Sequence, residues 1–240
     1  MKLSFVIPAY NEEKNIGPCL EAILAARAGK DYDIEIIVAN NASTDKTGQI
    51  AQSFKEVKVA DESRKGIVWA RQAGFLTSSG GLIANIDADT RLPVGWIEKV
   101  LAEFKANPDL VALSGPYIYY DLTSWQNFLT KLFYLLGKTI CLLTGQTMLQ
   151  GGNYVVRRNA LEKIGGYDTT IEFYGEDTDI ARRISRVGKV KFTFSLPMPT
   201  SGRRLATEGF FKIGLRYGLN YFWTTFFKKP FTQKYKDVRN

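Results

Sequence analysis

The sequence predicts an α/β fold: a single domain in which helices cover both faces of a mostly parallel central sheet. Three observations support this prediction. Short apolar segments alternate with segments of helical periodicity. Gly, Pro and polar clusters separate the two kinds of segment. The chain has 240 residues, 45% of them hydrophobic and 23% charged, which suits a globular protein with one sizeable core.

The predicted strands are short apolar runs that end at turn residues, as the first run ends at Pro8. They cover residues 3–7, 34–39, 57–60, 82–86, 110–114, 153–156 and 189–194. The first helix has Asn11 as a candidate N-cap, although Pro18 favours a start nearer Gly17. Further helices are expected at about residues 46–54, 67–74, 96–104, 160–164, 176–187 and 210–227.

Two segments are unusually rich in large apolar residues. Residues 117–149 form an apolar insert that is interrupted by Lys131 and Lys138, so it is not expected to span a membrane. It fits a helix in the membrane interface or a lid over an acceptor pocket, and equally a plain core helix. The stripe of residues 211, 215, 219, 222 and 226 leaves a similar choice between a membrane interface and packing on the body.

Charge is concentrated at the end of the chain. The net charge is +8, and residues 202–240 contain nine basic and two acidic residues. A basic tail indicates an anionic partner such as a diphosphate or a lipid headgroup, whereas no nucleic-acid motif accompanies it. We therefore expect a globular part at residues 1–205 and a basic, aromatic, amphipathic tail at residues 206–240.

The chain contains no histidine. This excludes Ser-His-Asp and Cys-His catalysis and histidine-ligated zinc, and it leaves base catalysis mainly to Asp or Glu. Cys19 and Cys141 lie too far apart in sequence for a metal motif, which favours a reduced compartment. No secretory signal is recognised, so a cytoplasmic location is expected.

Two acidic clusters are candidate sites. Asp87 and Asp89 follow a buried strand, where α/β sheets bind ligands, and they suit Mg²⁺ or Mn²⁺ carrying substrate phosphates. Glu176, Asp177 and Asp179 open a helix, where one acid can cap the N-terminus. Three crowded acids repel each other, which raises the pKa of at least one and can produce a general base. Neither of the two common glycine-rich phosphate loops is present.

In combination, four segments resemble a family-2 glycosyltransferase with the A-type, Rossmann-like fold. They are Val6-Ile7-Pro8-Ala9-Tyr10-Asn11-Glu12-Glu13, Asn41-Ala42-Ser43-Thr44-Asp45, Asp87-Ala88-Asp89, and Gly165-Gly166-Tyr167-Asp168 continuing to Gly175-Glu176-Asp177-Thr178-Asp179. The resemblance covers about residues 1–205.

The resemblance implies inverting transfer of a sugar from a nucleotide-diphosphate donor, UDP- or GDP-linked, to an acceptor hydroxyl. It assigns the nucleoside to Pro8, Ala9, Tyr10, Glu12, Asn40 and Arg71. It assigns ribose and metal–diphosphate to Asp87 and Asp89, with Asp89 as the direct metal ligand. The acid pair Glu176 and Asp177 supplies the base, a role that we carry onto Asp177.

The chain departs from the family pattern in two places. Ala39-Asn40-Asn41-Ala42 is neutral where acids are usual. Ser201-Gly202-Arg203-Arg204 replaces a histidine or a Gln-x-x-Arg-Trp element, so Arg203 or Arg204 is a candidate for diphosphate neutralisation. The turn at Gly151, Gly152 and Asn153 is a further candidate for approaching the diphosphate or the acceptor.

We expect a metal-dependent, non-processive enzyme that is peripherally associated with the membrane and uses a lipid-linked or glycan acceptor. Two alternatives stay open at this point. A nucleotidyltransferase acting on a sugar phosphate could use the same two metal carboxylates. A non-catalytic nucleotide-binding scaffold is the other.

Overall fold

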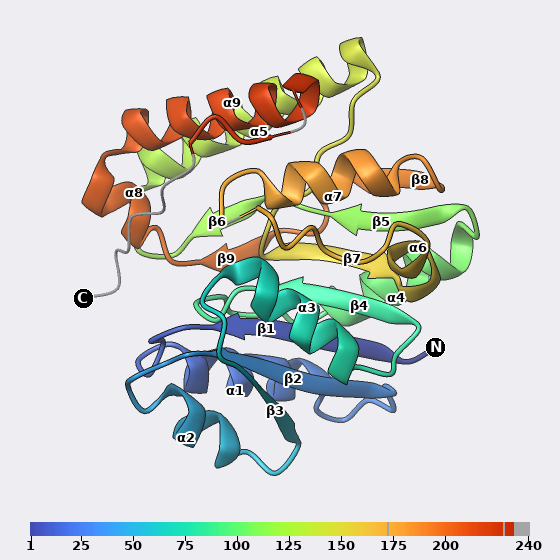
Figure 1. Ribbon diagram of the computed structural model, residues 1–240, viewed down its shortest axis with the longest axis vertical. Coiled ribbons are helices and arrows are strands. Elements are labelled where there is room, and N and C mark those ends of the chain that lie inside the picture. The colour runs from blue at the N-terminus through green and yellow to red at the C-terminus, as the bar shows by residue number, and fades with distance from the viewer. Residues whose placement is uncertain (172, 228, 233–240) are drawn as a thin grey trace.

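A seven-stranded sheet forms the centre of the protein, with helices on both faces (Figure 1). The computed structural model describes residues 1–171, 173–227 and 229–232, so Lys228 and the end of the predicted basic tail lie outside it. The strand order is β3-β2-β1-β4-β7-β5-β8. The strands are β1 (Leu3–Ala9), β2 (Ile34–Asn41), β3 (Val57–Glu62), β4 (Leu82–Ile86), β5 (Leu110–Ser114), β7 (Asn153–Arg157) and β8 (Lys189–Phe192).

The predicted α/β class and the mostly parallel sheet are confirmed, but β7 runs antiparallel to both of its neighbours, β4 and β5. It pairs Asn153 with Ile86, the last residue of β4. The start of β7 therefore lies at the carboxyl edge of the sheet, directly beside Asp87. This reversed strand brings the glycine turn at residues 151–152 to the same edge as the Asp87 motif.

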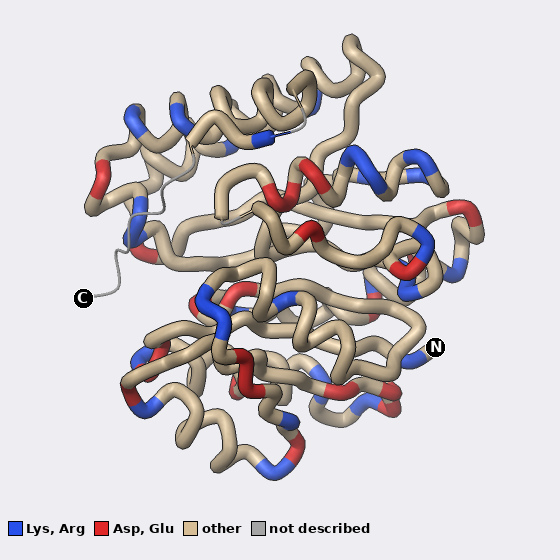
Figure 2. The backbone as a smooth tube through the Cα atoms, viewed as in Figure 1, with Lys and Arg blue, Asp and Glu red and all other residues tan. Residues whose placement is uncertain are grey.

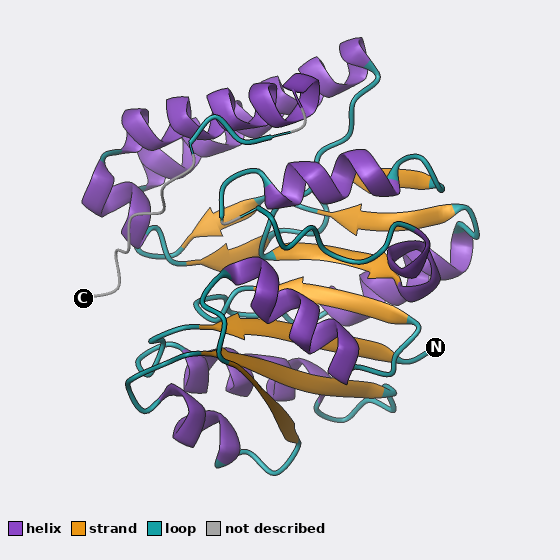
Figure 3. Cartoon of the chain, viewed as in Figure 1, coloured by secondary structure: helices purple, strands orange, loops and turns teal. Residues whose placement is uncertain are grey.

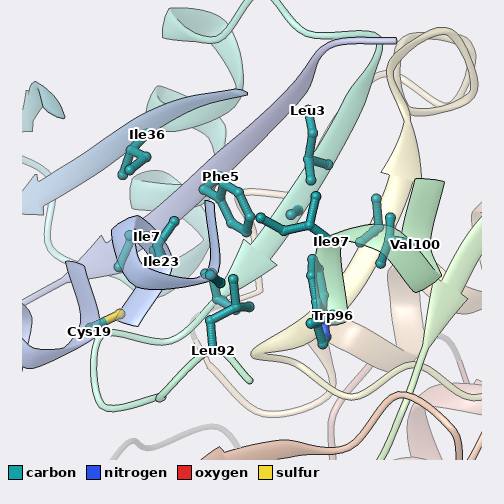
Figure 4. Packing of buried hydrophobic residues seen from close by; sticks show 14 of the residues in the cluster. Leu3, Phe5, Ile7, Cys19, Ile23, Ile36, Leu92, Trp96, Ile97 and Val100 are labelled. Carbon is teal, nitrogen blue, oxygen red and sulfur yellow. The ribbon is translucent and has the colours of Figure 1, made fainter. Parts of the chain in front are cut away.

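Alternate residues of the strands supply the core on the two faces of the sheet. Phe5 of β1 contacts α1 (Ile16–Arg27) and α4 (Trp96–Ala106), and its ring lies 6.0 Å from that of Trp96 (Figure 4). The neighbouring Val6 faces α3 (Ile67–Thr77), α6 (Arg158–Lys163) and α7 (Glu176–Ile184). The short α2 (Thr47–Gln52) packs beside α1.

Several element boundaries differ from the predictions. Pro8 does not end β1: it is paired in register with Ala39 of β2, and β1 continues to Ala9. Asn11 is not the N-cap of α1, which begins at Ile16 after Asn15. Asn11 instead has φ 49°, and its side-chain oxygen accepts from the Thr44 N–H at 2.8 Å. Pro18 lies in the first turn of α1, where backbone N–H groups need no helical partner.

The apolar insert forms β6 (Tyr117–Tyr119) and α5 (Ser124–Thr144). β6 pairs in parallel with β9 (Met198–Thr200), far along the chain. Thr123 caps α5: its hydroxyl accepts from the Gln126 N–H, and the Gln126 side chain accepts from the Thr123 N–H. After β9 come α8 (Arg203–Glu208) and α9 (Phe210–Phe227).

The helices α5 and α9 lie together at the top of the molecule in Figure 3, where α9 contacts α7 and α5 contacts β6. The Cys141 thiol and the Tyr221 hydroxyl join α5 and α9 at 2.9 Å. Among the described residues, neither helix nor any other combines the length and apolar character needed to cross a membrane.

The outer faces of α5 and α9 are apolar and exposed, whereas their other faces pack on the body of the protein. Contact of the exposed faces with a membrane stays a prediction. Figure 2 shows few charged positions along both helices. We call this exposed surface the apolar platform; Phe211 is 80% exposed and Leu143 is 81% exposed. Its residues are Trp125, Phe128, Leu132, Leu135, Leu136, Leu142 and Leu143 of α5 and Phe211, Leu215, Leu219, Phe222, Phe226 and Phe227 of α9.

Candidate active site

A cavity of about 800 Å³ lies at the carboxyl edge of the sheet, and we call it the polar cavity. It brings together residues that are widely separated in the sequence. Its predicted members are Pro8, Ala9, Tyr10, Glu12, Asp87, Asp89, Arg203 and Arg204. Lys65 and Trp69, which were not predicted, also line it.

A second cavity of about 500 Å³ lies between α5, α7 and α9, and we call it the apolar cavity. Arg71, Gly151, Glu176 and Asp177 line one part of it. The two cavities share a boundary made by Ile67, Asp87, Tyr117, Tyr119, Phe173, Leu205 and Tyr217. The Asp87-Ala88-Asp89 motif and the acids of α7 therefore face adjoining spaces.

Asp87 lies on the shared boundary and is held by the protein's own groups. Its Oδ2 accepts a hydrogen bond from the Tyr117 hydroxyl at 2.8 Å, and that hydroxyl accepts from the Gly152 N–H at 2.6 Å. A Cβ at residue 152 would overlap both Asp87 and Tyr117. The backbone of Gly152 thus approaches Asp87 and Tyr117 closely, rather than a ligand. Gly152 lines neither cavity.

Arg71 is 1% exposed and lies between the two acidic motifs. Its guanidinium forms an ion pair with Glu176, donates to the Gly151 carbonyl at 2.7 Å and lies 3.4 Å from Asp87 Oδ1. It lines the apolar cavity and not the polar one. Arg71 therefore joins α3, β4 and α7 from the side of the apolar cavity, and it is not found beside the predicted nucleoside residues in the wall of the polar cavity.

The acids at the start of α7 have different surroundings. Asp179 is 2% exposed and pairs with Arg182 and Arg183, which makes it structural. Glu176 binds Arg71 through Oε1, and its buried Oε2 has no hydrogen-bond partner among the described residues. Asp177 is half-buried and accepts from the Thr178 N–H at 2.8 Å.

Burial changes the proton affinity of both cavity-facing acids. It raises the pKa of Glu176 to about 8, although the charge of Arg71 opposes the rise. It also raises the pKa of Asp177, while the Thr178 N–H and Arg71 act in the opposite direction. A carboxylate with a raised pKa is a stronger base, and Asp177 is the one whose carboxylate is not committed to an ion pair.

Asp89 lines the polar cavity and is held there by two neighbouring side chains. Its Oδ2 lies 3.0 Å from an Arg203 nitrogen, and its Oδ1 accepts from the Thr200 hydroxyl at 3.1 Å. Arg203 also forms a bidentate ion pair with the buried Glu12. Burial raises the pKa of Asp89 to about 6, and Arg203 opposes this rise.

The carboxylates in the wall of the polar cavity suit a divalent ion that is also bound by phosphate oxygens of a nucleotide. Among the described residues, no group of three or more Asp, Glu, Cys or His side chains is placed to hold a metal. Mg²⁺ and Mn²⁺ bound with nucleotides need only one or two carboxylates, with phosphate oxygens and water completing the shell. Asp89, with Asp87 nearby on the cavity wall, fits that requirement.

Asn40 and Asn153, like Gly152, line neither of the two cavities. The Asn40 amide donates to Asp61 at 2.8 Å, and it is the next residue, Asn41, that lines the polar cavity. Asn153 is fully buried: it accepts from the Trp96 indole at 3.3 Å and donates to the Leu196 carbonyl at 2.8 Å. Asn153 is thus a core contact and not a diphosphate or acceptor ligand.

Sequence reasoning missed the tyrosines at the boundary of the two cavities. Tyr117 and Tyr119 come from the insert and Tyr217 from α9. The sequence patterns of the insert and of α9 indicated only apolar surfaces. Tyrosine hydroxyls within these otherwise apolar segments were the signal that could have indicated a binding site.

The sequence model of "Glycosyl transferase family 2" matches residues 4–165, more than half of the chain. The chain belongs to glycosyltransferase family 2. It is 29% identical over 208 residues to YdaM, a probable glycosyltransferase of Bacillus subtilis, covering 78% of this chain and 47% of that protein. It is 34% identical over 122 residues to the dolichol-phosphate mannosyltransferase of Pyrococcus furiosus, covering 49% and 34% respectively. The chain thus spans half or less of these relatives.

Solved structures of this glycosyltransferase family's fold superpose on nearly the whole chain. The mannosyltransferase PcManGT of Pyrobaculum calidifontis, in complex with GDP-Man and Mn²⁺, has a TM-score of 0.70 at 19% identity. The match covers 94% of this chain and 63% of that one. At this identity the likeness establishes the A-type, Rossmann-like fold.

We predict that the ion pair of Arg71 and Glu176 is strongly coupled. Arg71→Ala should lower the free energy of unfolding by about 3–5 kcal/mol, because it leaves Glu176 buried without a counter-charge. Adding Glu176→Gln should recover part of that loss, as urea unfolding of the two single variants and the double variant would show.

Glu162→Gln, whose carboxylate is exposed and 3.9 Å from Arg158, is the control and should change the free energy of unfolding by about 0.5 kcal/mol or less. Strictly additive losses at Arg71 and Glu176 would contradict the coupling.

Proposed function

We propose that this glycosyltransferase moves a sugar, with inversion, from a nucleotide-diphosphate donor to the hydroxyl of a lipid-linked acceptor at the cytoplasmic face of a membrane. The observation that carries this proposal is the shared boundary of the two cavities. Asp89 faces the polar cavity and Asp177 faces the apolar one. A donor and an acceptor bound in these spaces would meet beside Asp87.

The polar cavity is the proposed donor site. Pro8, Ala9, Tyr10 and Asn41 surround the space assigned to the nucleoside. Arg203 and Arg204 also line this cavity, and a guanidinium can bind phosphate oxygens in a bidentate manner. Related folds have been solved with GDP-Man and Mn²⁺, with UDP and with UDP-GlcNAc, which supports a UDP- or GDP-linked donor here.

Asp89 would hold Mg²⁺ or Mn²⁺ together with the donor diphosphate. Bound there, the ion would supply positive charge against the leaving nucleoside diphosphate. The chain's own residues do the remaining work. Arg203, which lies 3.0 Å from Asp89, can add positive charge beside the diphosphate. Asp87 is held by Tyr117 beside the position proposed for the donor.

Asp177 is the proposed general base. Inverting transfer occurs in one displacement, so one carboxylate must take the proton from the acceptor oxygen as it attacks. Glu176 is committed to Arg71, whereas Asp177 has a raised pKa and lines the apolar cavity. Arg71 positions both acids by fixing the start of α7.

The apolar platform is the proposed membrane contact. Its exposed aromatic and aliphatic side chains are accompanied by Lys131 and Lys138 on α5 and by Lys212 on α9, a combination that favours an anionic lipid surface. Relatives named for dolichyl-phosphate, dolichol-phosphate and dodecaprenyl-phosphate support an acceptor with a long lipid chain, whichever polar group that chain carries here. A free glycan acceptor is the alternative.

We predict that Asp177→Asn abolishes sugar transfer while donor affinity is retained. The amide cannot take a proton, and Asp177 lies outside the polar cavity. Transfer is followed with UDP- and GDP-sugars and Mn²⁺, and donor binding by calorimetry or thermal shift. Thr178→Ser is a suitable control, because it keeps the adjacent hydroxyl. Wild-type release of pyrophosphate from nucleoside triphosphates, without any turnover of nucleotide sugars, would instead support a nucleotidyltransferase.

Arg203→Ala should weaken donor binding by roughly 10- to 100-fold, the loss typical of a charge-assisted hydrogen bond. Arg203→Lys should recover only part of it, because lysine keeps the charge without bidentate geometry. Arg186→Ala, at an exposed position in the turn after α7, is the control and should bind donor like the wild type. If both Arg203→Ala and Arg204→Ala bind donor normally, neither arginine neutralises the diphosphate.

The protein is expected to float with vesicles that contain anionic lipid at moderate salt, and to bind less to neutral vesicles. Replacing Phe211 and Leu215, two outward residues of α9, with serine should reduce flotation several-fold without lowering the melting temperature. The matched control is Leu76→Ser, since Leu76 is 71% exposed on α3, away from the platform. Absence of flotation in the wild type would remove the membrane part of the proposal.

A further inference from the structure

The apolar cavity is an open space of about 500 Å³ and not a packed interface. It extends from Asp177 along the space between α5 and α9. Large apolar side chains of both helices line it, namely Phe133, Leu136, Ile140, Phe210, Phe222 and Phe226. Leu136, Phe222 and Phe226 belong also to the apolar platform, so the cavity and the platform are continuous.

Two glycines widen this space without serving any close contact. Gly214 and Gly218, one helical turn apart in α9, both line the cavity. A Cβ built on either would meet no atom within 4 Å. Glycine inside a helix costs about 1 kcal/mol relative to alanine. No neighbouring atom requires glycine at these two positions. Their effect is to leave open the part of the cavity that a side chain would fill.

The inner end of the cavity is acidic. Asp87, Glu176 and Asp177 line it, and of the described residues in its wall only Arg71 is positively charged. That charge is already used by Glu176, Asp87 and the Gly151 carbonyl. The buried Glu176 Oε2 lacks a hydrogen-bond donor, and a hydroxyl brings a donor whereas a phosphate dianion brings none.

We propose that the apolar cavity binds the acceptor as an amphiphile, with an uncharged hydroxyl at Asp177 and a hydrocarbon chain between α5 and α9, and that it discriminates against a lipid monophosphate. This inference rests on the proposed function and names its acceptor class. A phosphate at this position would face three carboxylates with no free cation among the described lining residues. It would also be ionised already and would need no base.

The corresponding step is balanced without any further reactant. The acceptor oxygen forms a bond to the anomeric carbon of the donor sugar as the bond from that carbon to the diphosphate oxygen breaks. The hydroxyl proton passes to the Asp177 carboxylate, and the nucleoside diphosphate leaves with the bonding electrons. The product is a glycoside on the lipid-linked alcohol.

The test compares two amphiphiles with one chain length, dodecyl β-glucoside and dodecyl phosphate, each titrated below its micelle concentration onto the intact protein. Dodecyl β-glucoside should bind at least tenfold more tightly than dodecyl phosphate. Gly214→Leu and Gly218→Leu should each weaken glucoside binding about tenfold by filling the cavity. Gly214→Ala should weaken it less. Gly81→Leu adds the same side chain at an exposed site where a Cβ also meets nothing, and it should bind like the wild type.

Two results would overturn the inference. Equal or tighter binding of dodecyl phosphate would reject the uncharged acceptor, and unchanged glucoside binding in both leucine variants would reject the position of the chain. Melting temperatures of the variants show that they are folded. Donor binding is measured separately with UDP- and GDP-sugars: retained donor binding with failed amphiphile selectivity removes only this inference, whereas absent donor binding removes the proposed function itself.

Discussion

The buried guanidinium of Arg71 is the interaction on which the rest of the site depends. A positive charge with 1% exposure is stable only if the surrounding structure supplies oxygen atoms, and here three separate segments supply them. They are the end of β4 at Asp87, the glycine turn at Gly151 and the start of α7 at Glu176. One side chain on α3 therefore fixes the relative positions of both acidic motifs before any ligand is present.

The antiparallel strand β7 is the second constraint, because it determines which turn Arg71 can reach. A parallel strand in the same place would put its start at the opposite edge of the sheet. The reversal instead places Gly151 and Gly152 beside Asp87, where Gly152 must lack a side chain to let Tyr117 bridge to the carboxylate. The antiparallel pairing of β7 is therefore what allows Tyr117 and Gly152 to hold Asp87 at the boundary of the two cavities.

The sequence predicted the fold class, most elements and the main acidic motifs, because these are local patterns of periodicity, turns and charge. It could not predict the direction of β7, since an apolar run has no polarity. The sequence predicted Asn40 as a cavity residue, whereas Asn41 lines the cavity. The strand β2 continues through both residues, and successive strand residues point to opposite faces of the sheet. The sequence assigned Arg71 to the nucleoside because only the tertiary structure shows that two buried acids surround it. For α5 and α9, composition could not tell which face looks outward.

The match to the family ends at residue 165, whereas α7, α8 and α9 lie beyond it. Most of the wall proposed for the donor lies before that point, and the proposed base and α9 lie after it. The two parts are nevertheless joined closely, because β8 pairs with β5, β9 pairs with β6, and Arg203 forms ion pairs with Glu12 and Asp89. A substitution in the later part can therefore alter the polar cavity through Arg203 as well as the apolar cavity through α7 and α9.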